Sequence, residues 1–308
     1  MDIAVDSQTS SRHRMDVLVT WKRLAASWEL YPLLALAAFT RFYHLNVTEF
    51  DADQANIFRM AHDAVSHGHL VATSNIASLG IYNPPAIIYL LMIPAAFSAN
   101  PLGGAIFTAL LGLIAVLFSY IFVRRYYGRL TAAIVAVLFA IMPLAVSYSR
   151  FMWNQNLLPS FVLLFIASLF WGVVERRKGW LAPAMILLGL LIQLHGTGLL
   201  MGLPFVIALL LAPRSTLRWR DLFIGIFGLL VLYSPYLLWL VYSHYRDIHY
   251  LLTTPITNQT SIDGQALNTY QYFLHPSGNQ STPPTSVMYA LARYSDLVYN
   301  ILTKVLLA

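Results

Sequence analysis

Three acidic residues lie within five positions early in this sequence, Glu49, Asp51 and Asp53. Asp51 and Asp53 form an Asp-x-Asp pattern, which can hold a divalent cation through carboxylate oxygens. One carboxylate at this place could instead act as a general base. A third possibility is a purely structural role as a helix cap. Aspartate is a preferred N-cap residue, and an acid at a helix N-terminus interacts favourably with the helix dipole. The pattern alone leaves these roles open.

An amphipathic pattern follows the acidic residues. Its apolar positions recur at the spacing of one helix face, and they are Ile57, Met60, Ala61, Ala64 and Val65. A helix with one apolar face is suited to lie on a membrane surface. We therefore expect Asp53 at the N-terminus of a surface helix.

Three further polar motifs are candidates for chemistry. Asn83 precedes a diproline that leads into a short apolar helix, and simple helix initiation is the alternative for this motif. Arg150 could bind a phosphate, or it could extend its guanidinium from an apolar segment to the interface. His195 lies at the end of an apolar stretch, where a polar group marks either a functional cavity or an ordinary helix end.

The elements that must position these residues are membrane helices. Of the 308 residues 58% are hydrophobic and 10% are charged, against roughly 25% charged in soluble domains. A soluble fold could not bury so much apolar surface. The chain has no cysteine, which excludes thiolate catalysis, cysteine-ligated metal centres and disulfides.

Seven apolar stretches are candidate membrane spans, although several are shorter than the roughly 20 residues that a crossing needs. They are Trp28–Tyr43, Leu102–Phe122, Thr131–Val146, Leu157–Val174, Trp180–Leu194, Gly198–Ala212 and Leu222–Val241. Ala86–Phe97 is too short and contains Pro94, so we assign it to the membrane interface. The sequence predicts an all-α, polytopic membrane protein of about seven transmembrane helices, with interfacial helices in a long first outer loop.

Positive charge predicts the orientation, because cytoplasmic loops are enriched in lysine and arginine. Most of the 19 basic residues fall in four segments, Arg12–Arg23, Arg124–Arg129, Arg176–Lys178 and Arg214–Arg220. We predict a multi-pass plasma-membrane protein with a cytoplasmic N-terminal tail (1–27), a transmembrane domain (28–241, first outer loop 44–101) and an outer-face C-terminal segment (242–308). Division of the basic residues among four segments argues against nucleic-acid binding. The scarcity of ionisable groups within the spans argues against an ion-coupled transporter.

Taken together, these motifs resemble the GT-C superfamily of polytopic glycosyltransferases. The similarity is to the protein O-mannosyltransferase-like, RgtA/B/C/D-like branch, which includes the lipid A aminoarabinose transferase. It covers about Trp28–Val241. The matching segments, in order, are Asp53-Gln54-Ala55, Asn83-Pro84-Pro85-Ala86, the basic loop with Gly128-Arg129, and Ser149-Arg150 with the run to Asn156.

The resemblance implies an enzyme of the cell envelope that transfers a sugar from a polyprenyl-phosphate donor to a glycan, lipid or protein acceptor on the outer face, with inversion. Asp53 would be the general base, and Asp51 would assist or help to hold a divalent cation. Arg150 would neutralise the leaving phosphate. The remaining candidates would line the substrate pocket, and they are Gln54, Asn83, Asn154, Asn156 and His195.

Three departures from the family pattern support a second hypothesis. Gln54 replaces the second acid of the Asp-Glu pair, and Asn154, Gln155 and Asn156 occupy the neighbourhood of the second-loop acid. Family members usually have more spans beyond the point that corresponds to residue 308. We therefore also consider a truncated or minimal member, or a non-catalytic protein that binds or carries polyprenyl phosphate.

Overall fold

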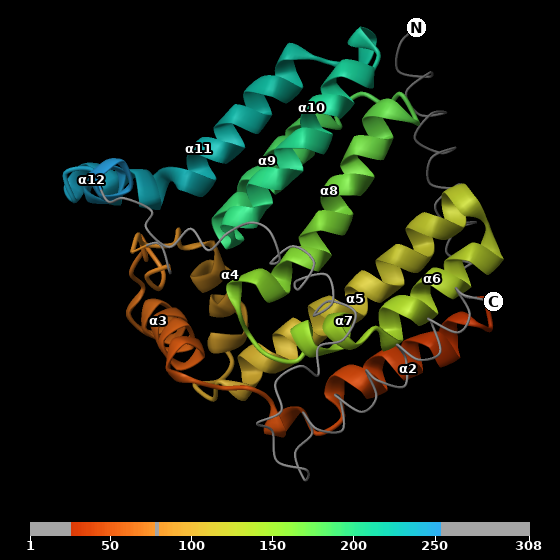
Figure 1. Ribbon diagram of the computed structural model, residues 1–308, viewed down its shortest axis with the longest axis horizontal. Coiled ribbons are helices and arrows are strands. Elements are labelled where there is room, and N and C mark those ends of the chain that lie inside the picture. Colours follow the sequence, from red (N-terminus) through yellow and green to blue (C-terminus); the bar gives the residue numbers. More distant parts are fainter. Residues whose placement is uncertain (1–25, 78–79, 254–308) are drawn as a thin grey trace, which may run out of the picture.

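The computed structural model describes residues 26–77 and 80–253, and these residues form helices joined by turns (Figure 1). The only paired extended residues described there form an isolated antiparallel bridge, Ile76 with Tyr82. The all-α prediction is therefore confirmed. Nearly all of the predicted tail 1–27 and most of the predicted segment 242–308 lie outside the described residues.

Every predicted span contains a helix of the structure. The bounds are α2 (Leu30–Phe42), α5 (Leu102–Tyr127), α6 (Arg129–Ile141), α7 (Pro143–Tyr148), α8 (Leu158–Val173), α9 (Leu181–Leu194), α10 (Gly202–Leu211) and α11 (Trp219–Tyr242). Three helical stretches are long and apolar enough to cross a membrane, namely Leu102–Tyr127, Asn154–Val173 and Trp219–Tyr242. A polytopic membrane protein is confirmed, and the count of seven spans stays a prediction.

The third predicted span is broken in two. The chain leaves the helical conformation at Met142, where α6 ends, and Pro143 begins α7. Proline has no backbone N–H to donate to the preceding turn, so it ends one helix and is well placed at the first position of the next.

Two helices of the predicted first outer loop pack on the bundle, α3 (Ala52–His67) and α4 (Ala86–Ala95). The apolar face of α3 does not lie on a membrane surface as predicted. Its residues Ile57, Ala61 and Ala64 are buried in one cluster with α4, Met152 and Leu194. The apolar surface of α4 covers this face within the protein. An amphipathic sequence pattern shows that one helix face is apolar, but it does not show whether protein or lipid covers that face.

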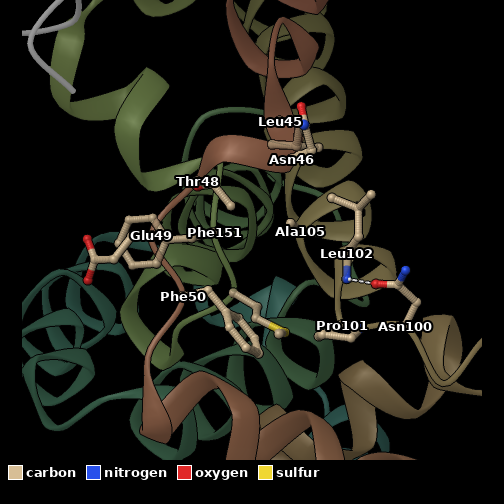
Figure 2. A pocket seen from close by; sticks show the side chains of 11 residues that line it. Leu45, Asn46, Thr48, Glu49, Phe50, Asn100, Pro101, Leu102, Ala105 and Phe151 are labelled. Carbon is tan, nitrogen blue, oxygen red and sulfur yellow. Dashed lines mark hydrogen bonds between the residues drawn. The ribbon is translucent and has the colours of Figure 1, made fainter. Parts of the chain in front are cut away.

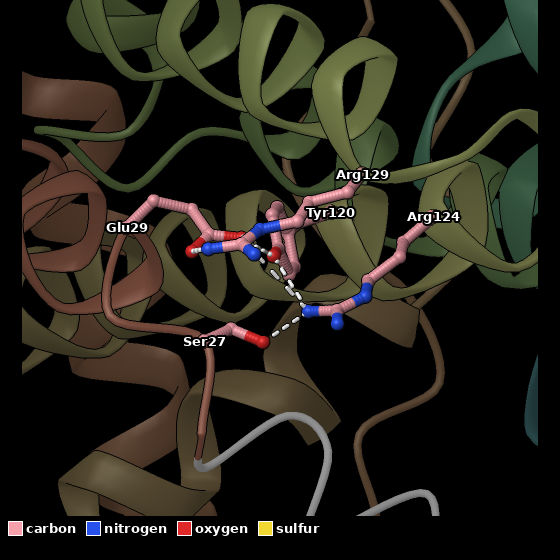
Figure 3. A network of polar contacts seen from close by, with 5 residues as sticks. All are labelled: Ser27, Glu29, Tyr120, Arg124 and Arg129. Carbon is pink, nitrogen blue, oxygen red and sulfur yellow. Dashed lines mark hydrogen bonds and ion pairs between the residues drawn. The ribbon is translucent and has the colours of Figure 1, made fainter.

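Opposite charges join three helices at one end of the bundle (Figure 3). Glu29, just before α2, accepts hydrogen bonds from Arg129 Nε and from the Tyr120 hydroxyl, both at 2.6 Å. Arg124 donates to the same hydroxyl at 2.8 Å and to Ser27. These bonds fix the start of α2 against the turn between α5 and α6.

The other basic segments meet at this same end. Arg125 pairs with Glu175 at 2.7 Å, and Asp221 accepts from the Gly179 N–H at 3.0 Å and from Arg218 at 3.1 Å. We call this the basic end. The helices α3 and α4 lie at the other, the loop end, away from the α5–α6 and α8–α9 turns (Figure 1). The predicted inner segments within the described residues therefore share one side of the bundle, and which side faces the cytoplasm stays a prediction.

Close packing after α9 gives a stability prediction. A Cβ at Gly198 would lie 2.4 Å from the carbonyl carbon and oxygen of Leu191, which are backbone atoms and cannot turn aside. Gly198→Ala is expected to lower the free energy of unfolding by about 2 kcal/mol, measured as a lower midpoint of thermal unfolding. Gly202→Ala is the control, because no neighbouring heavy atom lies within 4 Å of its added Cβ. Equal midpoints for the two variants would contradict the prediction.

Candidate active site

The N-terminus of α3 is closed by a capping box. Oδ1 of Asp51 accepts hydrogen bonds from the backbone N–H groups of Asp53 at 2.9 Å and of Gln54 at 3.4 Å. Gln54 returns the interaction, because its Oε1 accepts from the Asp51 N–H at 2.8 Å. Such reciprocal bonds satisfy donors that a helix start leaves unpaired. The motif therefore does cap a helix, and the N-cap is Asp51 and not Asp53.

Asp53 is left exposed on the first turn of α3, and one asparagine holds it. The Nδ2 of Asn75 donates to both Oδ1 and the main-chain oxygen of Asp53, each at 3.2 Å. Oδ1 of Asn75 in turn accepts from Asn56 Nδ2 at 2.5 Å, and its main-chain oxygen accepts from Asn83 Nδ2 at 2.9 Å. Asp53 and Asn83 are thus brought into one polar network through Asn75.

A short hairpin places Asn75 and Asn83 side by side. The Ser74 N–H donates to the oxygen of Asn83 at 2.7 Å, and the Asn83 N–H donates to the oxygen of Asn75 at 3.1 Å. Gly80 turns the chain with a φ of +78°, a conformation that favours glycine. Sequence reasoning missed Asn75 and Asn56. Asn56 could have been found from its position one turn after Asp53, whereas Asn75 carries no local signal.

Arg150 does not lie free to bind a phosphate. The residue is 4% exposed, and its two terminal guanidinium nitrogens donate to four main-chain oxygens at 2.7 to 3.2 Å, those of Thr40, Arg41, Tyr43 and His44. Thr40 and Arg41 lie in the last turn of α2, where helix geometry leaves carbonyls without partners, and Tyr43 and His44 follow directly. A cation there also interacts favourably with the helix dipole. The structure thus gives Arg150 a structural contact in place of the predicted phosphate contact.

The remaining pocket candidates lie at the loop end but outside the Asp53 network. Asn154 and Asn156 are buried in a 3-10 turn (Asn154–Leu157), and Asn156 Nδ2 donates to the oxygen of Phe151 at 2.8 Å. His195 ends α9, and its Nδ1 lies 2.8 Å from the hydroxyl of Thr197. Burial lowers the pKa of the His195 imidazole, which favours its neutral form.

A cavity of about 200 Å³ opens beside the start of α3 (Figure 2). One wall is the 3-10 turn Leu45–Val47 and the segment that follows it, and the other is the start of α5. Its polar lining consists of Asn46, Thr48, Glu49 and Asn100, and the rest is apolar. Burial, then the charge of Asp51, raises the pKa of Glu49. Of the three acidic residues only Glu49 lines this cavity, and Asp53 forms a separate candidate site with Asn75 and Asn83.

The donor set near Asp53 does not fit a divalent cation. Within residues 26–77 and 80–253 there is no group of three or more His, Asp or Glu side chains that could hold a metal. Ca²⁺ and Mg²⁺ take about six oxygen ligands, and Oδ1 of Asp51 is already used by two backbone amides. We therefore assign no step to a bound metal.

Comparison with solved structures identifies the fold. The apo crystal structure of ArnT from Cupriavidus metallidurans matches with a TM-score of 0.61 and 19% identity, over 81% of this chain and 48% of that chain. The structure of the same protein bound to undecaprenyl phosphate matches with a TM-score of 0.54 and 21% identity, over 72% and 43%. The described helices thus have the fold of the GT-C glycosyltransferases, as the sequence motifs predict.

The family follows from the sequence. Residues 82–239, just over half of the chain, match the family described as dolichyl-phosphate-mannose-protein mannosyltransferase. The chain belongs to this family. It is also 29% identical over 195 residues to "Putative mannosyltransferase YycA" of Bacillus subtilis (strain 168), over 60% of this chain and 28% of that protein. The chain therefore spans less than half the length of these relatives, and Asp53 precedes the segment that matches the family.

Proposed function

We propose that this protein transfers a sugar from a polyprenyl-phosphate donor to an acceptor on the outer face of the plasma membrane. The observation that carries the proposal is membership of a mannosyltransferase family over residues 82–239. The similar fold of ArnT, a protein crystallised with undecaprenyl phosphate, supports a lipid-phosphate donor. The acceptor could be a glycan, a lipid or a protein.

Asp53 is the proposed general base. It is an exposed carboxylate at the head of α3, oriented by Asn75 and joined through it to Asn83. A base of this kind removes the proton of the acceptor hydroxyl as that oxygen attacks the anomeric carbon. Polyprenyl phosphate departs from the opposite face of the sugar, so the anomeric configuration inverts.

Turnover by the purified protein in lipid nanodiscs tests this function. Labelled polyprenyl-phosphate sugars are supplied with and without candidate acceptors, and released lipid phosphate and transferred sugar are both measured. We expect transfer with an inverted anomeric configuration, read by NMR of the product. Transfer with retention would contradict direct displacement while leaving the transferase function intact.

A second candidate function is binding or carriage of polyprenyl phosphate without chemistry. Two observations favour it: Asp51 and Gln54 are occupied by helix capping, and Arg150 is occupied by main-chain oxygens. In these contacts Asp51 is not available to assist the base, and the Arg150 guanidinium is not available to neutralise the leaving phosphate. Saturable binding of the donor with no release of lipid phosphate by any preparation would support this alternative and contradict the transferase.

A further inference from the structure

A helix beyond the last predicted span packs on the hairpin that carries Asn75 and Asn83. This helix, α12 (Arg246–Thr253), lies beside the loop end in Figure 1. Its residue Asp247 is 2% exposed, and Oδ2 accepts a hydrogen bond from the Tyr82 N–H at 2.9 Å. The bond joins residues 165 positions apart and holds the position immediately before Asn83.

The hydroxyl of Tyr236, on α11, adds a second contact to the Tyr82 main chain. The Tyr236 hydroxyl lies 3.3 Å from Oδ2 of Asp247 and 3.4 Å from the main-chain oxygen of Tyr82. Both main-chain polar groups of Tyr82 are therefore held from α11 and α12. Within the described residues, Oδ1 of Asp247 is buried and has no partner. A buried carboxylate with an unpaired oxygen costs free energy, so Asp247 is a poor choice for stability alone.

Aromatic contacts fix the same residue from its sides. The ring of Tyr82 meets that of Trp239 edge to face at 5.2 Å, and the Arg246 guanidinium lies 5.4 Å from its centroid. The Tyr250 ring packs so closely on the hairpin turn that a Cβ at Gly80 would lie 2.6 Å from it. The described part of the hairpin therefore contacts α11 and α12 at Gly80 and at Tyr82.

The turn between α11 and α12 is itself strained. His244 and Tyr245 both adopt the left-handed conformation, with φ of 53° and 58°. Two consecutive non-glycine residues in the left-handed region cost free energy. Such a conformation persists only where many surrounding contacts hold it in place. The turn folds α12 back over the hairpin, which is the arrangement that brings Asp247 to Tyr82.

We propose that Asp247 is a positioning residue for the Asp53 site. It fixes the Tyr82 main chain, which sets Asn83 and its hairpin partner Asn75, and Asn75 orients the carboxylate of Asp53. This inference rests on the proposed function of Asp53 for its effect on turnover, whereas the anchoring of the hairpin is independent of it.

The test compares Asp247→Ala, Asp247→Asn and a matched control, Asp221→Ala, in nanodiscs. Asp221 has the same chemistry at the basic end: it is 3% exposed and accepts a backbone N–H, that of Gly179, at 3.0 Å. We expect Asp247→Ala to lower kcat by roughly 10- to 100-fold through misplacement of the base, with the donor KM unchanged. Asp247→Asn keeps an oxygen acceptor and should retain most of kcat, and Asp221→Ala should leave kcat unchanged even if it lowers thermal stability.

Hydrogen exchange supplies a readout that does not need turnover. The backbone amides of Ser74, Ala77, Tyr82 and Asn83 are hydrogen-bonded in the hairpin. They should exchange faster in Asp247→Ala and at the wild-type rate in Asp221→Ala. If these amides are protected in the wild type and exchange faster in Asp247→Ala, but the wild type transfers no sugar, the proposed function is wrong and the anchoring of the hairpin by Asp247 is supported.

Each result of these experiments either supports or overturns the positioning role of Asp247. Wild-type kcat in Asp247→Ala, equal loss in Asp247→Ala and Asp221→Ala, or unchanged exchange of the hairpin would each overturn the positioning role. If Asp247→Ala does not yield folded protein, Tyr236→Phe removes the bridging hydroxyl alone. It should also lower kcat without changing the donor KM, and a wild-type kcat in that variant would count against the proposal.

Discussion

Replacing Asp53 with asparagine is expected to lower the rate of sugar transfer by about 10²-fold or more, the usual contribution of a general base. Asparagine keeps the size of the side chain and an oxygen that can accept from Asn75 Nδ2, so the hairpin contact is preserved. The change removes only the ability to take a proton. The measurement is kcat with a labelled polyprenyl-phosphate sugar at saturating donor.

Asp63→Asn is the matched control for this experiment. Asp63 lies on the same helix α3 and forms an exposed i,i+4 pair with Arg59 at 3.7 Å, which contributes little to stability. Its substitution should leave transfer unchanged. Full transfer activity in Asp53→Asn would exclude Asp53 as the base, and an equal loss in both variants would point to a general effect of charge on α3.

Arg150→Ala is expected to lower the free energy of unfolding by about 3 kcal/mol or more, because four buried or half-buried carbonyl oxygens lose a charged donor. The effect should be seen as a lower midpoint of thermal unfolding. Arg150→Lys should restore only part of it, since an ammonium cannot reproduce the planar fork that reaches both pairs of oxygens.

The same variants test the phosphate role that the sequence predicts for Arg150. Normal thermal stability together with lost donor binding in Arg150→Ala would support the phosphate contact and contradict the structural one. Arg59→Ala is the control for a lost positive charge at the loop end, because its side chain is 68% exposed. We expect it to change thermal stability and donor binding little.

Local sequence patterns located most of the helices but did not show what those helices pack against. Apolar length and charge predicted α2, α5, α8, α9 and α11 within a few residues. The apolar face of α3 was also correct, but its partner was wrong because α4 begins nineteen positions after α3 ends. Hydrophobic periodicity reports that a face is buried and does not report what covers it.

The candidate site was likewise predicted in its residues but not in the contacts between them. The acidic motif and Asn83 were found from the sequence, and their connection was not, because it passes through Asn75 in a hairpin defined by pairing rather than by periodicity. The main-chain contacts of Arg150 were missed for a related reason. Its partners at the end of α2 are 106 to 110 positions away, and no local pattern indicates such a contact.

The short helices have a consequence for the surrounding bilayer. At 1.5 Å per residue, the 13 residues of α2 and the 14 of α9 extend only about 20 Å, against a hydrocarbon core of about 30 Å. Where α2 and α9 cross the membrane, as the sequence predicts, the lipids beside them must compress, or headgroups and water must move inward from the loop end. A donor phosphate would then meet the protein below the usual headgroup level, and turnover should fall as the acyl chains of the host membrane lengthen.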